Sequence, residues 1–123
     1  MTDYTRPVPP LHHDGHGLND RIHIASLGPE KGGSPDFYAV NGDGWTHRIN
    51  FQHGPRGVEG SIDGLTHEAL LAILIDRCEG FDRGPFSHPE NSACLDHLRA
   101  ALECCQRRAN ERAARNVLGQ YKA

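Results

Sequence analysis

The chain has 123 residues and a formal net charge of −3, so it is long enough for one domain or for a small domain with an appendage. General binding to nucleic acid or to a membrane surface requires a broadly basic protein, which this mildly acidic composition excludes. No apolar run reaches membrane-spanning length and the first ten residues lack a signal-peptide pattern, so we expect a cytoplasmic protein.

The N-terminal part is rich in proline and then in histidine, and we assign residues 1–18 to a flexible N-terminal segment. Two interpretations of its histidines stay open: a loop in which they make hydrogen bonds, or a metal site that would make the protein a metal-dependent hydrolase. No second cluster has matching spacing, so we prefer the loop and predict no metal. The four potential ligands are His12, His13, Asp14 and His16.

Residues 19–64 predict a small antiparallel β-sheet and a connector. Three segments, RIHIASL, DFYAV and WTHRINFQ, alternate in polarity or are rich in β-branched and aromatic residues, which is typical of strands. The turns GPEKGGSP and NGDG between them favour hairpins. We expect a short fourth strand near residues 58–62.

The connector HGPRGVEGSIDG is rich in glycine but contains no GK[ST], which excludes a nucleotide-hydrolysing phosphate loop. Its arginine, Arg56, is flanked by proline and glycine, so we expect it to be exposed. A plain surface arginine and a contact to a ligand or to another subunit both fit this position.

Residues 65–119 predict an antiparallel hairpin of two helices, so the predicted fold class is α+β. Thr66 is a plausible N-cap, Gly84 and Pro85 break the chain, and Ser87 with Glu90 fits a capping box. All four cysteines of the chain fall in these helices without a CxxC pair, and we interpret them as reduced.

The second helix of this hairpin carries a narrow apolar seam whose steps alternate between three and four residues. The helix is roughly 40 Å long at about 1.5 Å per residue, and one short partner does not cover that length. We therefore expect other subunits to complete its packing. The seam consists of Leu95, Leu98, Leu102, Cys105, Ala109 and Arg112.

Charged residues occupy the C-terminal end of the seam. Arg112 has no acidic residue three or four positions away, and Arg108 shares only Glu111. Two arginines four residues apart on one helix face are suited to phosphate, because each guanidinium offers paired donors and a permanent charge. A solvated basic end, or a contact to a partner's carboxylate, is the alternative.

These segments together resemble a known family. The motifs are GLTHEALLAI (64–73), IDR (75–77), GF (80–81), GPF (84–86) and EN (90–91), with FQHGP (51–55) upstream and Arg108, Arg112 and Arg115 downstream. Residues 19–119 resemble the helical-hairpin family of phage immune-evasion proteins, which contains the anti-Thoeris and anti-CBASS sequestering proteins. The β-rich segment before the hairpin makes the chain more similar to the anti-Thoeris branch.

The resemblance implies a protein that is not an enzyme and needs no cofactor. Family members are hexameric sponges in the cytoplasm of the infected bacterial host, where they bind cyclic nucleotide signals intact and so block host antiviral effectors. The implied ligand is a cyclic ADP-ribose isomer and, in some members, also a cyclic trinucleotide in a separate pocket. The implied partner is a homo-oligomer of at least two chains, with neither polymeric nucleic acid nor membrane.

Carried over by motif, the family's aromatic stacking position falls on Phe81 and its polar residue after the turn on Asn91. The two phosphate-contacting arginines fall on Arg108 and Arg112, and Arg56 matches the connector arginine of the trinucleotide pocket. Along one helix Asn91 and Arg112 are some 30 Å apart, so this site would join the turn of one subunit to the arginine end of another.

The chain departs from the family in its tail, where Asn116 and Leu118 replace a glycine and a glutamate. This departure counts against the trinucleotide pocket more than against the cyclic ADP-ribose pocket. A further alternative is an oligomeric virion or adaptor protein that binds no small molecule.

Overall fold

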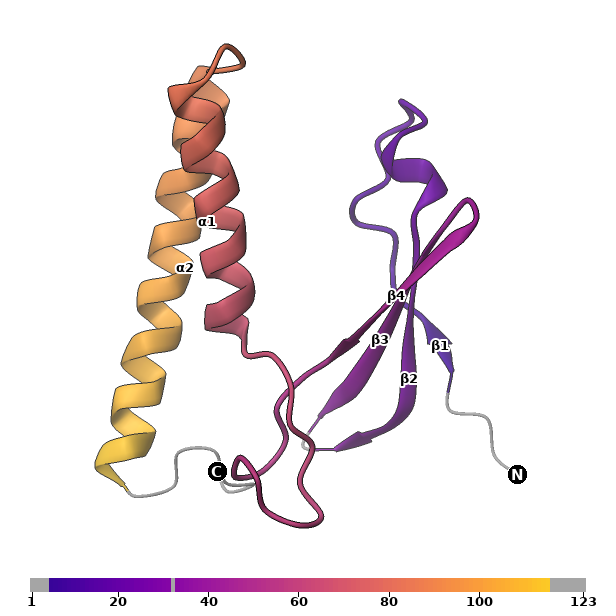
Figure 1. Ribbon diagram of the computed structural model, residues 1–123, viewed down its shortest axis with the longest axis vertical. Helices are drawn as coiled ribbons and strands as arrows, with labels where there is room; N and C mark the ends of the chain where they lie inside the picture. Colours follow the sequence, from indigo (N-terminus) through magenta and orange to yellow (C-terminus); the bar gives the residue numbers. More distant parts are fainter. Residues whose placement is uncertain (1–4, 32, 116–123) are drawn as a thin grey trace. The chain divides into compact units, whose positions relative to one another are not determined.

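The computed structural model describes residues 5–31 and 33–115 (Figure 1). It confirms the predicted α+β class, because an antiparallel sheet is followed by two helices. The chain divides into two compact units, with the division between Gly64 and Leu65. The elements are β1 (Arg6–Pro7), a 3-10 helix η1 (Asn19–Arg21), β2 (His23–Lys31), β3 (Ser34–Gly42), β4 (Trp45–Asn50), α1 (His67–Arg83) and α2 (Pro89–Ala114).

The first unit is built on a four-stranded sheet in the order β1-β2-β3-β4, and every neighbouring pair is antiparallel. The turn predicted between the last two strands is confirmed: Gly42 pairs with Trp45, which leaves a two-residue loop, and Gly44 has a φ of 79°. The strands β2 and β3 are longer than predicted and extend into GPEKGGSP, with a register shift between Leu27 and Glu30.

The fourth strand is not where we predicted it. Residues 58–62 contribute only an isolated bridge from Ile62 to His53, because Gly57 and Gly60 adopt positive φ angles that interrupt extended backbone. The fourth strand is instead β1, from the segment assigned as flexible, which lies at the sheet edge, where a proline is tolerated.

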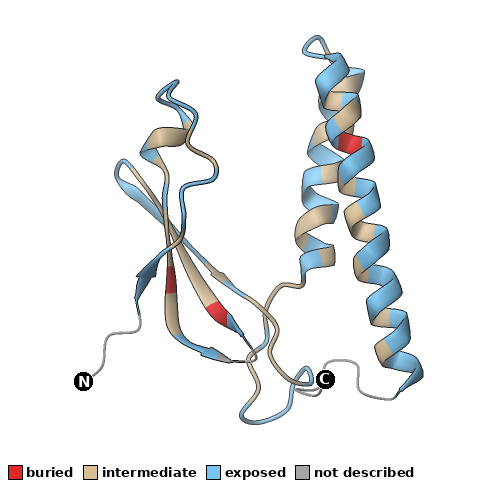
Figure 2. Cartoon of the chain, turned by 180° about the vertical axis from the view of Figure 1, so that it is seen from behind, coloured by how far each residue is buried: buried red, intermediate tan, exposed pale blue. Residues whose placement is uncertain are grey.

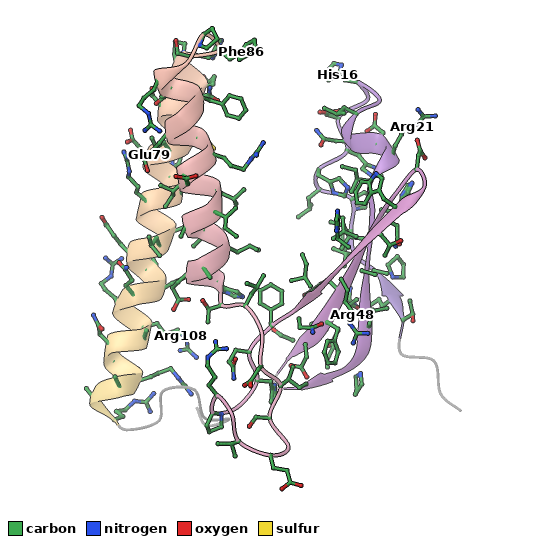
Figure 3. The ribbon with its side chains drawn as sticks, viewed as in Figure 1. His16, Arg21, Arg48, Glu79, Phe86 and Arg108 are labelled. Atoms are coloured by element: carbon green, nitrogen blue, oxygen red, sulfur yellow. The ribbon has the colours of Figure 1, made fainter. Side chains whose placement is uncertain are left out.

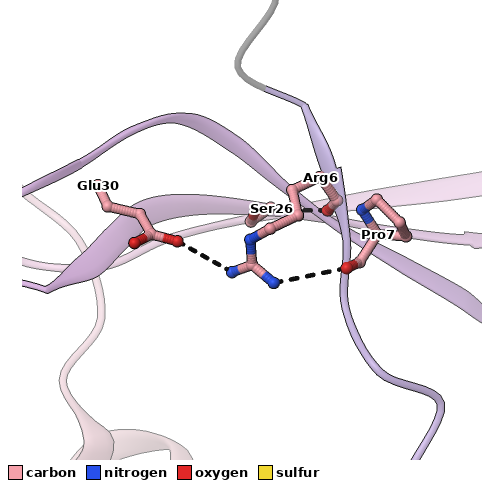
Figure 4. A network of polar contacts seen from close by, with 4 residues as sticks. All are labelled: Arg6, Pro7, Ser26 and Glu30. Carbon is pink, nitrogen blue, oxygen red and sulfur yellow. Dashed lines mark hydrogen bonds and ion pairs between the residues drawn. The ribbon is translucent and has the colours of Figure 1, made fainter.

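The short β1 is held to β2 by side chains as well as by backbone (Figure 4). Ser26, which is only 1% exposed, donates its hydroxyl to the carbonyl of Arg6 at 3.3 Å. The guanidinium of Arg6 lies 3.3 Å from a carboxylate oxygen of Glu30 and 3.4 Å from the carbonyl of Pro7. A buried serine with its donor satisfied explains how so short a strand keeps its register.

The second unit is the helical hairpin of α1 and α2. Thr66 is confirmed as an N-cap, since its hydroxyl accepts the N–H of Ala69 at 3.1 Å. The capping box predicted from Ser87 is wrong: α2 begins one residue later, with His88 as N-cap. There the Nδ1 atom of His88 accepts the N–H of Glu90 at 3.0 Å.

Little of this hairpin is buried within the single chain (Figure 2). In the described part of the chain, Leu95 is the only buried hydrophobic residue, at 5% exposure, and the other seam residues of α2 are half-buried. The sequence of α1 is apolar almost all round, which is typical of a helix buried on more than one side. None of its residues is buried, however, and Ile73 and Leu74 are 52% and 44% exposed. Much of the apolar surface of the hairpin therefore stays exposed to water in the single chain, where another chain could cover it.

Two predictions concern residues outside the described ranges: the end of the second helix at Gly119, and the tail positions Asn116 and Leu118. Within the described part, neither helix combines the length and apolar character that a membrane span requires.

Candidate ligand-binding site

Phe81 and Asn91 lie on either side of the turn between the two helices. The ring of Phe81 is 42% exposed, and the guanidinium carbon of Arg77, one helical turn earlier, lies 5.8 Å from its centroid. An exposed ring of this kind is available to stack on a base. Asn91 is half-buried, and its Nδ2 donates to the carbonyl of Phe86 at 3.3 Å, so the amide is fixed against the turn.

The arginine end of α2 differs in part from the prediction. Arg108 is exposed and makes no hydrogen bond or ion pair with any described residue. Arg112 is half-buried and takes part in an interaction within the chain, although no acidic residue lies three or four positions away from it. Glu111 pairs with Arg115, four residues further along the helix, whereas Arg107 donates to the sulfur of Cys104 at 3.2 Å.

One chain does not bring the turn and the arginines together. The helix α2 is continuous from Pro89 to Ala114, so Asn91 and Arg108 are separated by about 26 Å at about 1.5 Å per residue. Phe86 and Arg108 lie at opposite ends of the hairpin (Figure 3). A single small ligand therefore contacts both groups only if they come from different chains.

Arg56 is exposed, as predicted, and the connector holds it in place. Its guanidinium donates to the carbonyl of Gly64 at 3.2 Å. The carboxylate of Asp63 accepts the N–H of Gly57 at 3.0 Å and the Nε2–H of Gln52 at 3.1 Å. The backbone N–H of Gly57 first, then Gln52 and Arg56, lower the pKa of Asp63 from its ordinary value, because each favours the charged carboxylate.

The histidine-rich segment is used for loop structure. His12 and His13 both place Nε2 near the carbonyl of Ile22, at 2.6 and 3.0 Å. The carboxylate of Asp14 accepts the N–H of His16 at 3.1 Å. Among the residues that the structure describes, no three histidine, cysteine or acidic side chains are placed to hold a metal ion. These contacts favour the hydrogen-bonded loop over the metal-dependent hydrolase.

Asp20 organises the same loop. Its two carboxylate oxygens accept the backbone N–H groups of Asp14, Gly15 and Gly17 at 2.9, 3.1 and 2.9 Å. These donors, with Gly17 contributing most, lower the pKa of Asp20 from its ordinary value of 3.8. The segment 14–20 is therefore a closed turn whose carboxylates are already occupied.

The structure contains one further feature near the turn that sequence reasoning missed. A shallow hollow of about 400 Å³, wide open to solvent, is lined by Asp82, Ser87, His88, Pro89 and Ser92. The Oδ1 atom of Asp82 is shielded from solvent and has no hydrogen-bond partner in the described chain. No local pattern identifies this hollow, because it depends on α1 and α2 facing each other at their linked ends.

The comparison with known proteins adds one finding, and no family model matches the chain. Over 74 residues the chain is 34% identical to the protein named Thoeris anti-defense 1 of Bacillus phage SBSphiJ7. The alignment covers 60% of this chain and 51% of the phage protein, so the chain spans about half the length of the curated relative it matches. The resemblance to the anti-Thoeris branch is confirmed at this level: the chain is similar in sequence to a phage Thoeris anti-defence protein.

Proposed function

We propose that this chain is a phage immune-evasion protein that acts against Thoeris defence. It binds a cyclic adenine nucleotide signal, with a cyclic ADP-ribose isomer as the favoured ligand, and holds it without degrading it. Host effectors that respond to this signal then stay inactive. The similarity to the Thoeris anti-defense 1 protein carries this proposal, and the contacts of the hairpin support it.

The proposed ligand contacts use the chemistry of both ends of the hairpin. The exposed ring of Phe81 stacks on the adenine, a contact worth about 1–3 kcal/mol. Asn91 holds its amide against the turn and contacts a base edge or a ribose hydroxyl. Arg108 and Arg112 bind the pyrophosphate, because a guanidinium matches phosphate oxygens with paired, charge-assisted donors.

The proposed site is shared between chains, and the protein is a homo-oligomer of at least two copies and most simply a hexamer. The separation of about 26 Å between Asn91 and Arg108 along α2 requires a second chain to supply the arginines. The exposed Ile73 and Leu74 on α1 are available for such an interface, because a soluble chain gains free energy by covering apolar side chains.

A second pocket for a cyclic trinucleotide involves Arg56. The hydrogen bond from Arg56 to the carbonyl of Gly64 keeps the guanidinium in a defined place on the connector, where it can meet phosphate. Both pockets operate in the cytoplasm of the infected host, where the immune signal is made. Sequestration there needs no catalytic group and no cofactor.

The test is a thermal-shift panel of cyclic mono-, di- and trinucleotides, with oligomer size measured by light scattering. We expect cyclic ADP-ribose isomers to raise the melting temperature, and heat denaturation to return the ligand chemically unchanged. Recovery of hydrolysed ligand would identify an enzyme instead. If no cyclic nucleotide changes the melting temperature, the sequestration proposal is overturned and an oligomeric adaptor or virion protein is favoured.

A further inference from the structure

The hollow at the turn of the hairpin lies at the same end of the helical unit as the proposed base-stacking position. Its walls come from the end of α1 and the beginning of α2, and Asp82 follows Phe81 directly in the chain. At about 400 Å³ and open to solvent, the hollow can take part of a nucleoside while the rest of the ligand extends beyond it. The hollow and the exposed ring of Phe81 therefore belong to the same end of the helical unit.

Asp82 is the charged group of this hollow, and its hydrogen bonding is incomplete. Its Oδ2 atom accepts the hydroxyl of Ser92 at 3.2 Å, which links α1 to α2. Its Oδ1 atom is buried and accepts no hydrogen bond from the described residues. A buried carboxylate oxygen without a donor is unfavourable, and proteins retain such an atom where a ligand, a water or an ion completes it.

The carboxylate of Asp82 determines which ligand groups can bind beside it. An ionised carboxylate only accepts hydrogen bonds and repels phosphate, so it requires a neutral group with donors. The χ2 torsion of an aspartate is broad and two-fold, so a small rotation presents either oxygen to the hollow. Two neighbouring hydroxyls match two carboxylate oxygens, which is how an acidic residue recognises a ribose in dinucleotide-binding folds.

We propose that Asp82 is a specificity-determining residue that accepts hydrogen bonds from the hydroxyl groups of the ribose attached to the stacked base. This inference rests on the proposed function, since it requires a nucleotide at Phe81. The proposed contact to Asp82 also fixes the orientation of the ligand. The ribosyl end lies at the turn, beside the carboxylate, and the pyrophosphate lies toward Arg108 of another chain, away from Asp82.

The experiment compares the dissociation constants of a cyclic ADP-ribose isomer and of its analogue lacking the adenosine ribose hydroxyl, measured by calorimetry. We expect the wild-type protein to bind the hydroxylated ligand about tenfold more tightly than the deoxy analogue. Asp82→Asn should remove this preference by weakening the hydroxylated ligand alone. The matched control is Asp96→Asn, the same change at an exposed position of α2, which should keep the preference.

Each other outcome has a defined meaning. A preference that survives Asp82→Asn overturns the ribose assignment, and so does an equal loss for both ligands, which would indicate a different donor such as an adenine amine. If Asp82→Asn does not fold, Asp82→Ala takes its place, because it also removes the carboxylate and should remove the preference. If wild-type protein binds neither ligand, the proposed function fails together with this inference; if it binds both equally, only the inference fails.

Discussion

The exposed apolar face of α1 provides the sharpest test of assembly. Ile73 is 52% exposed although it lies in the middle of a helix of 17 residues. Burying a whole isoleucine side chain contributes about 1.5–3 kcal/mol, so covering the exposed half contributes about 1 kcal/mol per chain. In a two-fold symmetric interface the same residue contributes from both chains, which gives about 2 kcal/mol per dimer.

Ile73→Ala should therefore weaken dimer formation by about 30-fold, since 1.4 kcal/mol corresponds to a factor of ten in a dissociation constant. The hairpin itself should stay folded, because the exposed half of this side chain makes no packing contact within the chain. Leu18→Ala is the matched control: Leu18 is 82% exposed, but it lies in the N-terminal loop of the other unit.

The assay is sedimentation velocity over a range of protein concentrations, with circular dichroism to follow helix content. We expect Ile73→Ala to shift the midpoint of assembly to higher concentration, whereas Leu18→Ala matches the wild-type protein. A wild-type protein that is monomeric at every concentration, or an Ile73→Ala variant that assembles as well as the wild type, would refute the reasoning and remove the shared site.

Three further predictions concern single side chains. Leu95→Ala should lower the free energy of unfolding of the helical unit by about 2–5 kcal/mol, measured by urea denaturation, because Leu95 is its buried hydrophobic residue. Arg108→Ala should abolish binding of the cyclic nucleotide in the thermal-shift assay without changing oligomer size; retained affinity would remove the arginine from the site. The pKa of Asp63 is lowered from 3.8, so its contribution to connector stability is present above pH 4 and is lost as pH falls through the lower folded value. The amide signal of Gly57 should report this loss in an NMR titration, and a midpoint above 3.8 would contradict it.

Local signals in the sequence were sufficient for the main elements. Alternation of polarity predicted the strands, and the NGDG turn predicted the hairpin that ends at Trp45, because both depend on residues close in the chain. The Thr66 cap was predictable for the same reason. The cap of α2 was not, since a histidine accepts the first N–H group in place of the expected serine.

Features that depend on distant parts of the chain were not predictable. The strand β1 forms because Ser26 is buried against the carbonyl of Arg6, a contact across 20 residues. The hollow beside Asp82 requires Ser92 to approach from the second helix. The positions of Phe81 and Asn91 at the turn followed from the resemblance, whereas their role in binding stays a prediction.

The unbroken course of α2 has a consequence for how such a protein can change. One residue inserted between Asn91 and Arg108 would turn the arginine by about 100° around the helix axis and move it about 1.5 Å along it. A whole heptad would restore the face but would displace the guanidinium by about 10 Å, more than a small ligand tolerates. The proposed site therefore predicts that adaptation to a new signal proceeds through side-chain replacements at the two ends of the hairpin, while the number of residues between them stays constant.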